Sequence, residues 1–119
     1  PLNVSGPFHS PMLKGAGEKL AKELEHVTIH DIAIPYVTNV TGDFVKDSSE
    51  VKDLLAAQVS NSVKWIQCVE AMLADGVDTF IEIGPGRTLS SFVKKINKEV
   101  TIVNVDKYAD LDKVKELLA

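Results

Sequence analysis

A histidine near the start of the chain is the residue best suited to chemistry. His9 lies in the run Val4-Ser5-Gly6-Pro7-Phe8-His9-Ser10-Pro11-Met12. Histidine can take up and return a proton near neutral pH, which is the task of a general base. Such a base serves a nucleophile, yet no serine of the chain lies in a strand-turn-helix elbow flanked by glycines. From this segment alone, a histidine that only hydrogen-bonds a carbonyl is the simpler interpretation.

The residues that follow His9 predict a helix that would hold it in place. Ser10 and Pro11 are typical of an N-cap and a first helical residue, because the serine oxygen can accept from a free amide and proline has no N–H to leave unpaired. Apolar residues then recur with the spacing of one buried helical stripe, at Leu13, Ala16, Leu20, Ala21, Leu24 and Val27. We therefore expect His9 just outside the N-terminus of an amphipathic helix.

The rest of the chain predicts alternating strands and helices. Short β-branched and apolar runs predict strands at 34–40, 78–83 and 101–105. Helical spacing of apolar residues predicts helices within 48–59, 63–73, 89–96 and 111–118. The strand-helix-strand-helix order at the C-terminal end predicts a parallel sheet with right-handed crossovers. We expect an α/β fold in which residues 1–119 form a single unit.

Composition limits the functions that the chain can have. The 119 residues are 45% hydrophobic and 25% charged, which suits one soluble domain or a large piece of one. The net charge of −4 gives no electrostatic case for nucleic acid, and no apolar run is long enough to span a membrane. The lone Cys68 predicts a core thiol in a reducing compartment, the cytoplasm. Because Pro1 leads directly into Leu2-Asn3-Val4, we expect a fragment.

The loop Gly84-Pro85-Gly86 suggests a second kind of site. A strand that turns through glycines into a helix can present amides to an anion such as phosphate. The chain has neither G-x-G-x-x-G nor the Walker pattern at this loop, so a tight strand-to-helix turn is favoured. Glu82, between two isoleucines, is expected to hydrogen-bond loop amides and not to act as a catalytic acid. A small anion-binding or coenzyme A-binding module stays open as an alternative.

Several segments together resemble one enzyme family. They are the run from Val4 to Met12, the segment 35–42, Gln58 with the following Val63-Lys64-Trp65, and Phe80-Ile81-Glu82-Ile83-Gly84-Pro85-Gly86-Arg87. Their order and spacing resemble the C-terminal part of malonyl-CoA:acyl carrier protein transacylases. The resemblance implies the C-terminal part of a parallel-sheet, α/β-hydrolase-like acyltransferase core layered with helices. Acyltransferase domains of polyketide synthases are similar, so a piece of one of those stays open.

The resemblance implies roles for particular residues. His9 matches the catalytic histidine, and Gln58 matches the position whose main-chain carbonyl orients that histidine. Phe8 matches a selectivity position, where a bulky residue favours malonyl over branched acyl groups. Lys94 and Lys95 are possible contacts to the acidic carrier protein, although a solvated pair that balances a helix dipole is the simpler account. Asn39 matches a recurrent asparagine, to which only local turn bonding is assigned.

The implied activity belongs to a longer protein. It is malonyl transfer from coenzyme A to the phosphopantetheine thiol of acyl carrier protein in fatty acid synthesis, by a Ser-His ping-pong mechanism. Malonyl-CoA is the substrate, acyl carrier protein is the partner, and neither a cofactor nor a metal is implied. The serine, the arginine for the malonyl carboxylate and the oxyanion amides belong to a missing N-terminal portion. We therefore expect this chain alone to be inactive, with uncovered sheet edges and apolar surface. A subunit that completes a partner's active site with His9 is a further alternative.

Overall fold

The computed structural model describes residues 6–119, so Val4 and Ser5 of the run around His9, and Pro1, lie outside the described residues. The chain divides into two compact units, Pro1–Ala71 and Met72–Ala119, called here the N-terminal and C-terminal units. The single unit predicted over residues 1–119 stays a prediction.

The helix predicted after His9 is present. A 3-10 turn, η1 (Pro11–Leu13), leads into α1 (Lys14–Leu24), with proline at the first turn as expected. The prediction that Ser10 caps this helix with its side chain is wrong, because its hydroxyl donates backward to the carbonyl of Pro7 at 2.7 Å. The helix also ends before Val27, the last residue of the predicted stripe.

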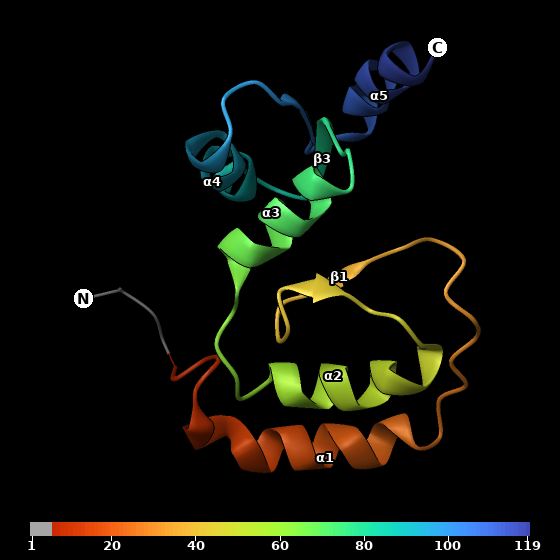
Figure 1. Cartoon of the computed structure of the whole chain (residues 1–119), viewed down its shortest axis with the longest axis vertical. Helices are drawn as coiled ribbons and strands as arrows, with labels where there is room; N and C mark the ends of the chain where they lie inside the picture. Colours follow the sequence, from red (N-terminus) through yellow and green to blue (C-terminus); the bar gives the residue numbers. More distant parts are fainter. Residues whose placement is uncertain (1–5) are drawn as a thin grey trace. The chain divides into compact units, whose positions relative to one another are not determined.

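Two helices form a layer of the N-terminal unit. A 3-10 turn, η2 (Ser48–Glu50), opens α2 (Val51–Gln58), and the carboxylate of Asp47 accepts from the amide of Ser49 at 2.8 Å. Figure 1 shows α1 and α2 side by side, and their residues pack against each other. The buried residue of α1 is Gly17, which marks the surface where the two helices meet.

A small hairpin completes the N-terminal unit. Strands β1 (Val37–Thr38) and β2 (Asp43–Phe44) are antiparallel, so the strand predicted over 34–40 is much shorter in the structure. The chain reverses at Gly42, whose φ is 72° and whose amide donates to the carbonyl of Thr38 at 2.9 Å. The turn over residues 39–42 ends the strand at Thr38, before the last two residues of the predicted run.

The hairpin meets the start of α3 (Trp65–Ala74). The carbonyl of Asn39 accepts from the amide of Lys64 at 2.9 Å, and its side-chain oxygen lies 3.8 Å from the sulfur of Cys68. The restriction of Asn39 to local turn bonding is therefore too narrow, because the residue ties the hairpin to a helix. Cys68 is a core thiol as predicted, and burial raises its pKa.

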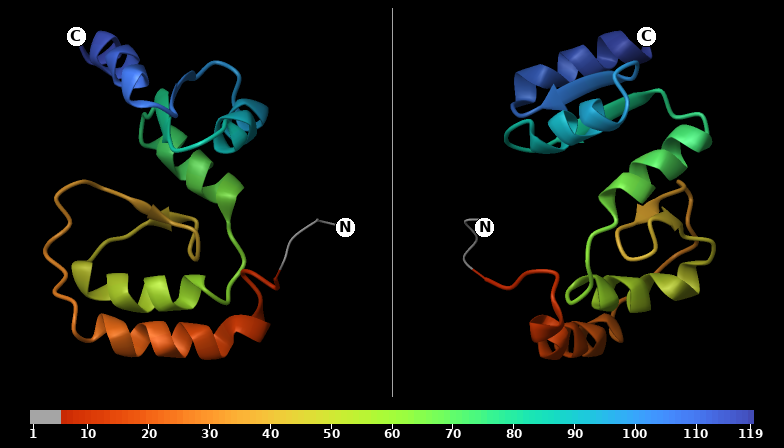
Figure 2. Two further views of the ribbon diagram at one scale, coloured as in Figure 1. Left: turned by 180° about the vertical axis from the view of Figure 1, so that it is seen from behind. Right: turned by 60° about the vertical axis from the view of Figure 1, so that its left-hand side comes forward.

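The C-terminal unit is a parallel β-α-β arrangement followed by a helix. Strand β3 (Thr79–Ile83) is followed by α4 (Thr88–Ile96), β4 (Thr101–Val105), the 3-10 turn η3 (Tyr108–Asp110) and α5 (Leu111–Leu118). The two strands pair in parallel from Thr79↔Thr101 to Ile83↔Val105, which confirms the predicted parallel pairing. Helix α4 packs against β3 and α5 against β4, and the right-hand view of Figure 2 shows the strands between these helices.

Apolar surface is left uncovered in both units. Ile34 of the N-terminal unit and Ile83 of the C-terminal unit are each 80% exposed. Over residues 6–119 the parallel sheet contains two strands, so each has an unpaired edge. Uncovered edges and apolar residues were expected from the sequence. No helix within this described range is both long and apolar enough to cross a bilayer.

Candidate active site

The structure brings His9 and Gln58 together across 49 positions of sequence. The Nδ1 atom of His9 lies 3.0 Å from the main-chain oxygen of Gln58. His9 precedes η1 and α1, whereas Gln58 is the last residue of α2, so the packing of α1 on α2 creates this contact. The acceptor is a backbone carbonyl, and the glutamine side chain takes no part in it.

The contact fixes the chemistry of the imidazole ring. A carbonyl oxygen only accepts hydrogen bonds, so Nδ1 must carry a hydrogen. In the neutral ring, Nε2 then holds the lone pair that can take a proton. His9 is exposed, and within residues 6–119 its Nε2 has no hydrogen-bond partner. The arrangement is that of a base whose orientation is set on one side and whose reactive nitrogen is open on the other.

The end of α2 explains why this carbonyl is available. The last carbonyls of a helix have no partner within the helix and need one elsewhere. The carbonyl of Ala57 accepts from the amide of Ser60 at 3.2 Å and from the side-chain nitrogen of Asn61 at 2.7 Å. That of Gln58 accepts from His9. Asn61 was not among the residues predicted from the sequence, although an asparagine three residues after a helix end is a signal for such a cap.

His9 has an unusual backbone conformation. Its φ is 56°, in the left-handed region that non-glycine residues seldom occupy. The hydroxyl of Ser10 holds the turn by its bond to Pro7, and the Gln58 carbonyl holds the ring. Strained backbone of this kind concentrates at functional sites, where surrounding contacts maintain it. The sequence pattern did not indicate this conformation, because glycine, the residue most typical of it, is not at position 9.

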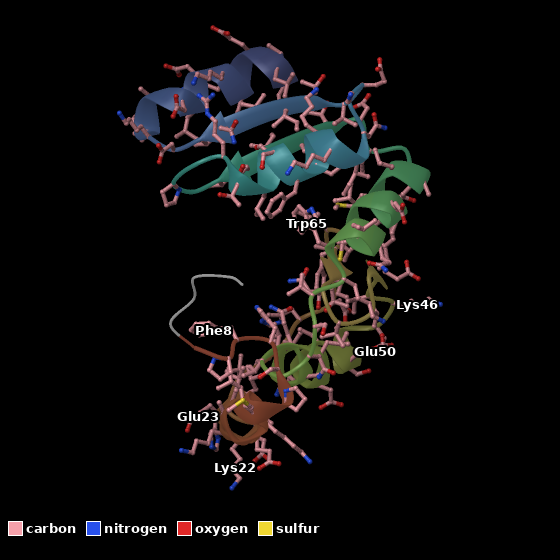
Figure 3. All side chains as sticks on the ribbon, turned by 90° about the vertical axis from the view of Figure 1, so that its left-hand side faces the viewer. Phe8, Lys22, Glu23, Lys46, Glu50 and Trp65 are labelled. Carbon is pink, nitrogen blue, oxygen red and sulfur yellow. The ribbon has the colours of Figure 1, made fainter. Side chains whose placement is uncertain are left out.

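Phe8 lies next to His9 and does not pack beneath the helix. Its side chain is 65% exposed, and Figure 3 shows it on the segment that leads into α1. Its role in selectivity for malonyl stays a prediction.

Glu82 forms the second polar centre, in the C-terminal unit. It is a hydrogen-bonded carboxylate as predicted, but the amides that it accepts from belong to helix α4 and not to the loop before it. Its carboxylate accepts from the amides of Leu89 at 3.1 Å and Ser90 at 2.9 Å, in the first turn of α4. It also accepts from the hydroxyl of Ser90 at 2.6 Å and the side-chain nitrogen of Asn104 at 3.0 Å. The bonds from Ser90 above all lower the pKa of Glu82. Sequence analysis did not identify Ser90 or Asn104.

This centre occupies the place where an anion was considered. The amides of Leu89 and Ser90 in the first turn of α4 already bond the carboxylate of Glu82, so these two are not free for a phosphate. In the polar hollow beside it, Lys113 pairs with Asp110 at 2.6 Å. The same pairing, with two backbone amides, lowers the pKa of Asp110 to about 2. These groups favour a structural turn over a binding module.

The two candidate lysines differ in their surroundings. The ammonium of Lys94 donates to the carbonyls of Lys98 at 3.0 Å and Val100 at 2.7 Å. That of Lys95 lies 5.7 Å from the centre of the Phe92 ring. Lys94 is therefore engaged in closing the segment after α4, whereas Lys95 is the freer charge. Within the described range, no three His, Cys, Asp or Glu side chains gather as a metal site.

Comparisons with known proteins place the chain beside one group of enzymes. No protein-family model matches it. The chain is 41% identical over 105 residues to the malonyl CoA-acyl carrier protein transacylase of Bacillus subtilis strain 168, a match that covers 88% of the chain and 33% of that protein. It superposes on the crystal structure of the malonyl CoA-acyl carrier protein transacylase from Clostridium perfringens with a TM-score of 0.89 at 45% identity, over 98% of the chain and 37% of that structure.

A third match is a malonyl-transacylase solved in complex with a type II polyketide synthase acyl-carrier protein. The TM-score is 0.89 at 33% identity, over 98% of the chain and 38% of that protein. The resemblance and the α/β fold class predicted from the sequence are thus confirmed. The chain spans about a third of the length of the curated relatives it matches.

Proposed function

We propose that this chain is the histidine-bearing, C-terminal third of a malonyl CoA-acyl carrier protein transacylase. In the full-length polypeptide, residues 1–119 form part of the acyltransferase core, and the remaining portion brings the nucleophilic serine to His9. The contact between His9 Nδ1 and the Gln58 carbonyl carries this proposal, because it leaves Nε2 as the basic nitrogen. The similarity to transacylases over nearly the whole chain supports it.

The first half of the reaction charges the enzyme. The Nε2 atom of His9 takes the proton of the serine hydroxyl as the serine oxygen bonds the malonyl carbonyl carbon. The bond from that carbon to the sulfur of coenzyme A then breaks, and the imidazolium returns the proton to the departing thiolate. The Gln58 carbonyl keeps its bond to Nδ1–H throughout and stabilises the imidazolium when it forms.

The second half passes the malonyl group on. Nε2 takes the proton from the phosphopantetheine thiol of acyl carrier protein as the sulfur bonds the same carbonyl carbon. The serine ester bond breaks, and the proton returns to the serine oxygen. The products are malonyl-acyl carrier protein and free enzyme, so one histidine serves as base and acid in both halves.

Other groups of the chain fit into this reaction. Phe8 would limit the bulk of the acyl group, and its position directly before His9 and its exposure support this role. Lys95, and to a lesser degree Lys94, would meet the acidic carrier protein. The buried, unpaired Cys68 agrees with a reducing compartment, the cytoplasm. The supply of malonyl units implies a role in fatty acid biosynthesis.

A direct test measures malonyl transfer by the natural full-length polypeptide. Malonyl-CoA and acyl carrier protein are mixed with it, and the mass of the carrier protein is followed. We expect the carrier to gain one malonyl group and His9→Ala to lower the rate by about 10³-fold or more. His26→Ala is the matched control, because His26 is also an exposed histidine of the N-terminal unit. Equal rates for wild type and His9→Ala would rule out the assigned role.

A second candidate is malonyl transfer to a polyketide carrier protein. The solved complex of a related malonyl-transacylase with such a carrier favours it. The chemistry at His9 is the same in both cases, and the difference lies in the carrier. Comparing kcat/KM for a fatty acid carrier and a type II polyketide carrier decides between them, since the natural partner should give the higher value.

A further inference from the structure

Gly17 lies at the closest approach of the two helices that form the candidate site. It is the buried residue of α1. A Cβ atom added there would lie 2.8 Å from the carbonyl oxygen of Ala56 and 3.7 Å from the Cβ of Val59. Oxygen and carbon atoms that are not bonded do not approach to 2.8 Å without displacement. The spacing of α1 and α2 therefore requires glycine at this position.

The same two segments make the bond between His9 and Gln58. Ala56 lies two residues before Gln58 in the last turn of α2, and the segment of His9 runs directly into α1. A movement of the end of α2 away from Gly17 would carry the Gln58 carbonyl with it. Packed helices shift as units because their interiors are close-packed.

The size of that movement is enough to matter. Ordinary van der Waals contact for an added Cβ begins at 3.4 Å, so relief of the 2.8 Å contact needs a retreat of about 0.6 Å. The bond from His9 Nδ1 to the Gln58 oxygen is 3.0 Å long. A retreat of about that size along the bond would take it past the length at which a hydrogen bond is counted.

We propose that Gly17 is a positioning residue for the base: by admitting the Ala56 carbonyl against α1, it keeps the Gln58 carbonyl within hydrogen-bond reach of His9. This inference rests on the proposed function of His9 for its effect on catalysis. Its effect on the ring itself depends on the contact alone. When the carbonyl withdraws, no hydrogen bond to it favours the Nδ1–H tautomer of the neutral ring. The tautomeric equilibrium then shifts toward the Nε2–H form, which histidine prefers in water. The lone pair is then on the wrong nitrogen.

The experiment compares two glycines of α1 in the natural full-length polypeptide. Gly17→Ala and Gly17→Val add side chains at the helix contact. Gly15→Ala is the matched control, because an added Cβ at Gly15 meets no atom within 4 Å. Steady-state malonyl transfer gives kcat and KM, and ¹⁵N NMR of the histidine rings gives the position of the hydrogen on His9.

We expect kcat to fall about fivefold for Gly17→Ala and about 10²-fold for Gly17→Val, with KM for malonyl-CoA little changed. The His9 ring should shift from the Nδ1–H toward the Nε2–H form in the same order. Gly15→Ala should match wild type in both measurements. A purely structural role would lower the amount of folded protein but leave the ring of the folded fraction as Nδ1–H.

Two outcomes would overturn the inference. One is a Gly17→Val protein with wild-type kcat and an Nδ1–H ring. The other, which applies if Gly17→Val does not fold, is a folded Gly17→Ala protein whose His9 ring and kcat equal those of Gly15→Ala. Failure of the proposed function is separate: it would appear as a wild-type polypeptide without malonyl transfer, whereas the shift of the His9 ring in the Gly17 variants would still support the positioning role.

Discussion

The two polar centres of this molecule use helix ends in opposite ways. His9 meets the C-terminal end of α2 through one hydrogen bond, and its second ring nitrogen has no partner within residues 6–119. Glu82 meets the N-terminal end of α4 and accepts four hydrogen bonds, from two amides, a hydroxyl and an amide side chain. His9 therefore has a ring nitrogen that is open to a further partner, whereas the carboxylate of Glu82 is fully occupied by hydrogen bonds within the fold.

This difference separates chemistry from architecture. A carboxylate surrounded by donors is stabilised in its charged form and has no reason to exchange protons, as the lowered pKa of Glu82 shows. An imidazole held at one nitrogen keeps its orientation and can still react at the other. The Gly84-Pro85-Gly86 loop resembles a binding motif, yet His9, whose ring has an open nitrogen, is the better candidate for catalysis.

The largest effect should come from His9→Asn. Asparagine tolerates the left-handed backbone and its side-chain nitrogen can donate to the Gln58 carbonyl, but it cannot act as a base. We expect kcat for malonyl transfer by the full-length polypeptide to fall about 10³-fold, while the circular dichroism spectrum stays that of wild type. Glu82→Gln, which keeps the shape of the other centre, should retain activity. A catalytic loss of equal size in folded Glu82→Gln would break the division of roles.

The next effect is on thermal stability, where a change at Glu82 should cost more than a change at His9. Glu82→Ala leaves the amides of Leu89 and Ser90 and the side chain of Asn104 without their acceptor. We expect the melting temperature to fall by about 5 °C. His9→Asn should melt within about 1 °C of wild type. Scanning calorimetry gives both values, and a larger fall for His9→Asn would contradict the comparison.

Acid should weaken the carboxylate centres in a defined range. The pKa values of Glu82 and Asp110 are lowered on folding, so in acid the unfolded chain binds more protons than the folded chain. Their stabilisation is present above the ordinary values of 4.5 and 3.8 and is lost as pH falls, for Asp110 toward about 2. Urea unfolding at pH 5 and pH 3 should show this loss. The double variant Glu82→Gln, Asp110→Asn should show a smaller pH dependence; an unchanged dependence would refute the assignment.

The smallest effects concern the two lysines after the Glu82 centre. Lys94→Met removes the donor to the carbonyls of Lys98 and Val100, so the free energy of unfolding should fall by about 1 kcal/mol. Lys95→Met should change it by less than about 0.5 kcal/mol. If Lys95 meets the carrier protein, the KM for acyl carrier protein should rise about threefold in Lys95→Met, with the KM for malonyl-CoA unchanged. Urea titration and steady-state kinetics measure these differences.

The sequence predicted the elements whose signals are local. Strand β4 and helix α4 lie where β-branched runs and helical spacing placed them, because each is decided by neighbouring residues. The short strand β1 was predicted too long, and at its C-terminal end the reason is the hairpin turn that follows Thr38. Ser10 was assigned a cap that it does not make, because the turn at His9 directs its hydroxyl to Pro7.

Only some residues of the candidate site could be predicted from the sequence. Residue types identified His9, whereas the position of Gln58 came from the family resemblance, since a main-chain acceptor leaves no side-chain signature. Asn61 was missed although its bond to the Ala57 carbonyl is local, four residues back along the chain. Gly17 was missed because its importance arises where α1 and α2 meet, far apart along the chain. Contacts of this kind depend on tertiary packing, which local patterns do not encode.

The left-handed backbone of His9 sets stability and activity against each other. A side chain in this region costs about 1 kcal/mol, and glycine is the residue that avoids the cost. Selection for heat resistance alone would favour glycine at position 9, whereas the proposed malonyl transfer requires histidine there. Engineering programmes that rank variants of this protein by melting temperature should therefore hold position 9 fixed, because gains found there would come at the expense of turnover.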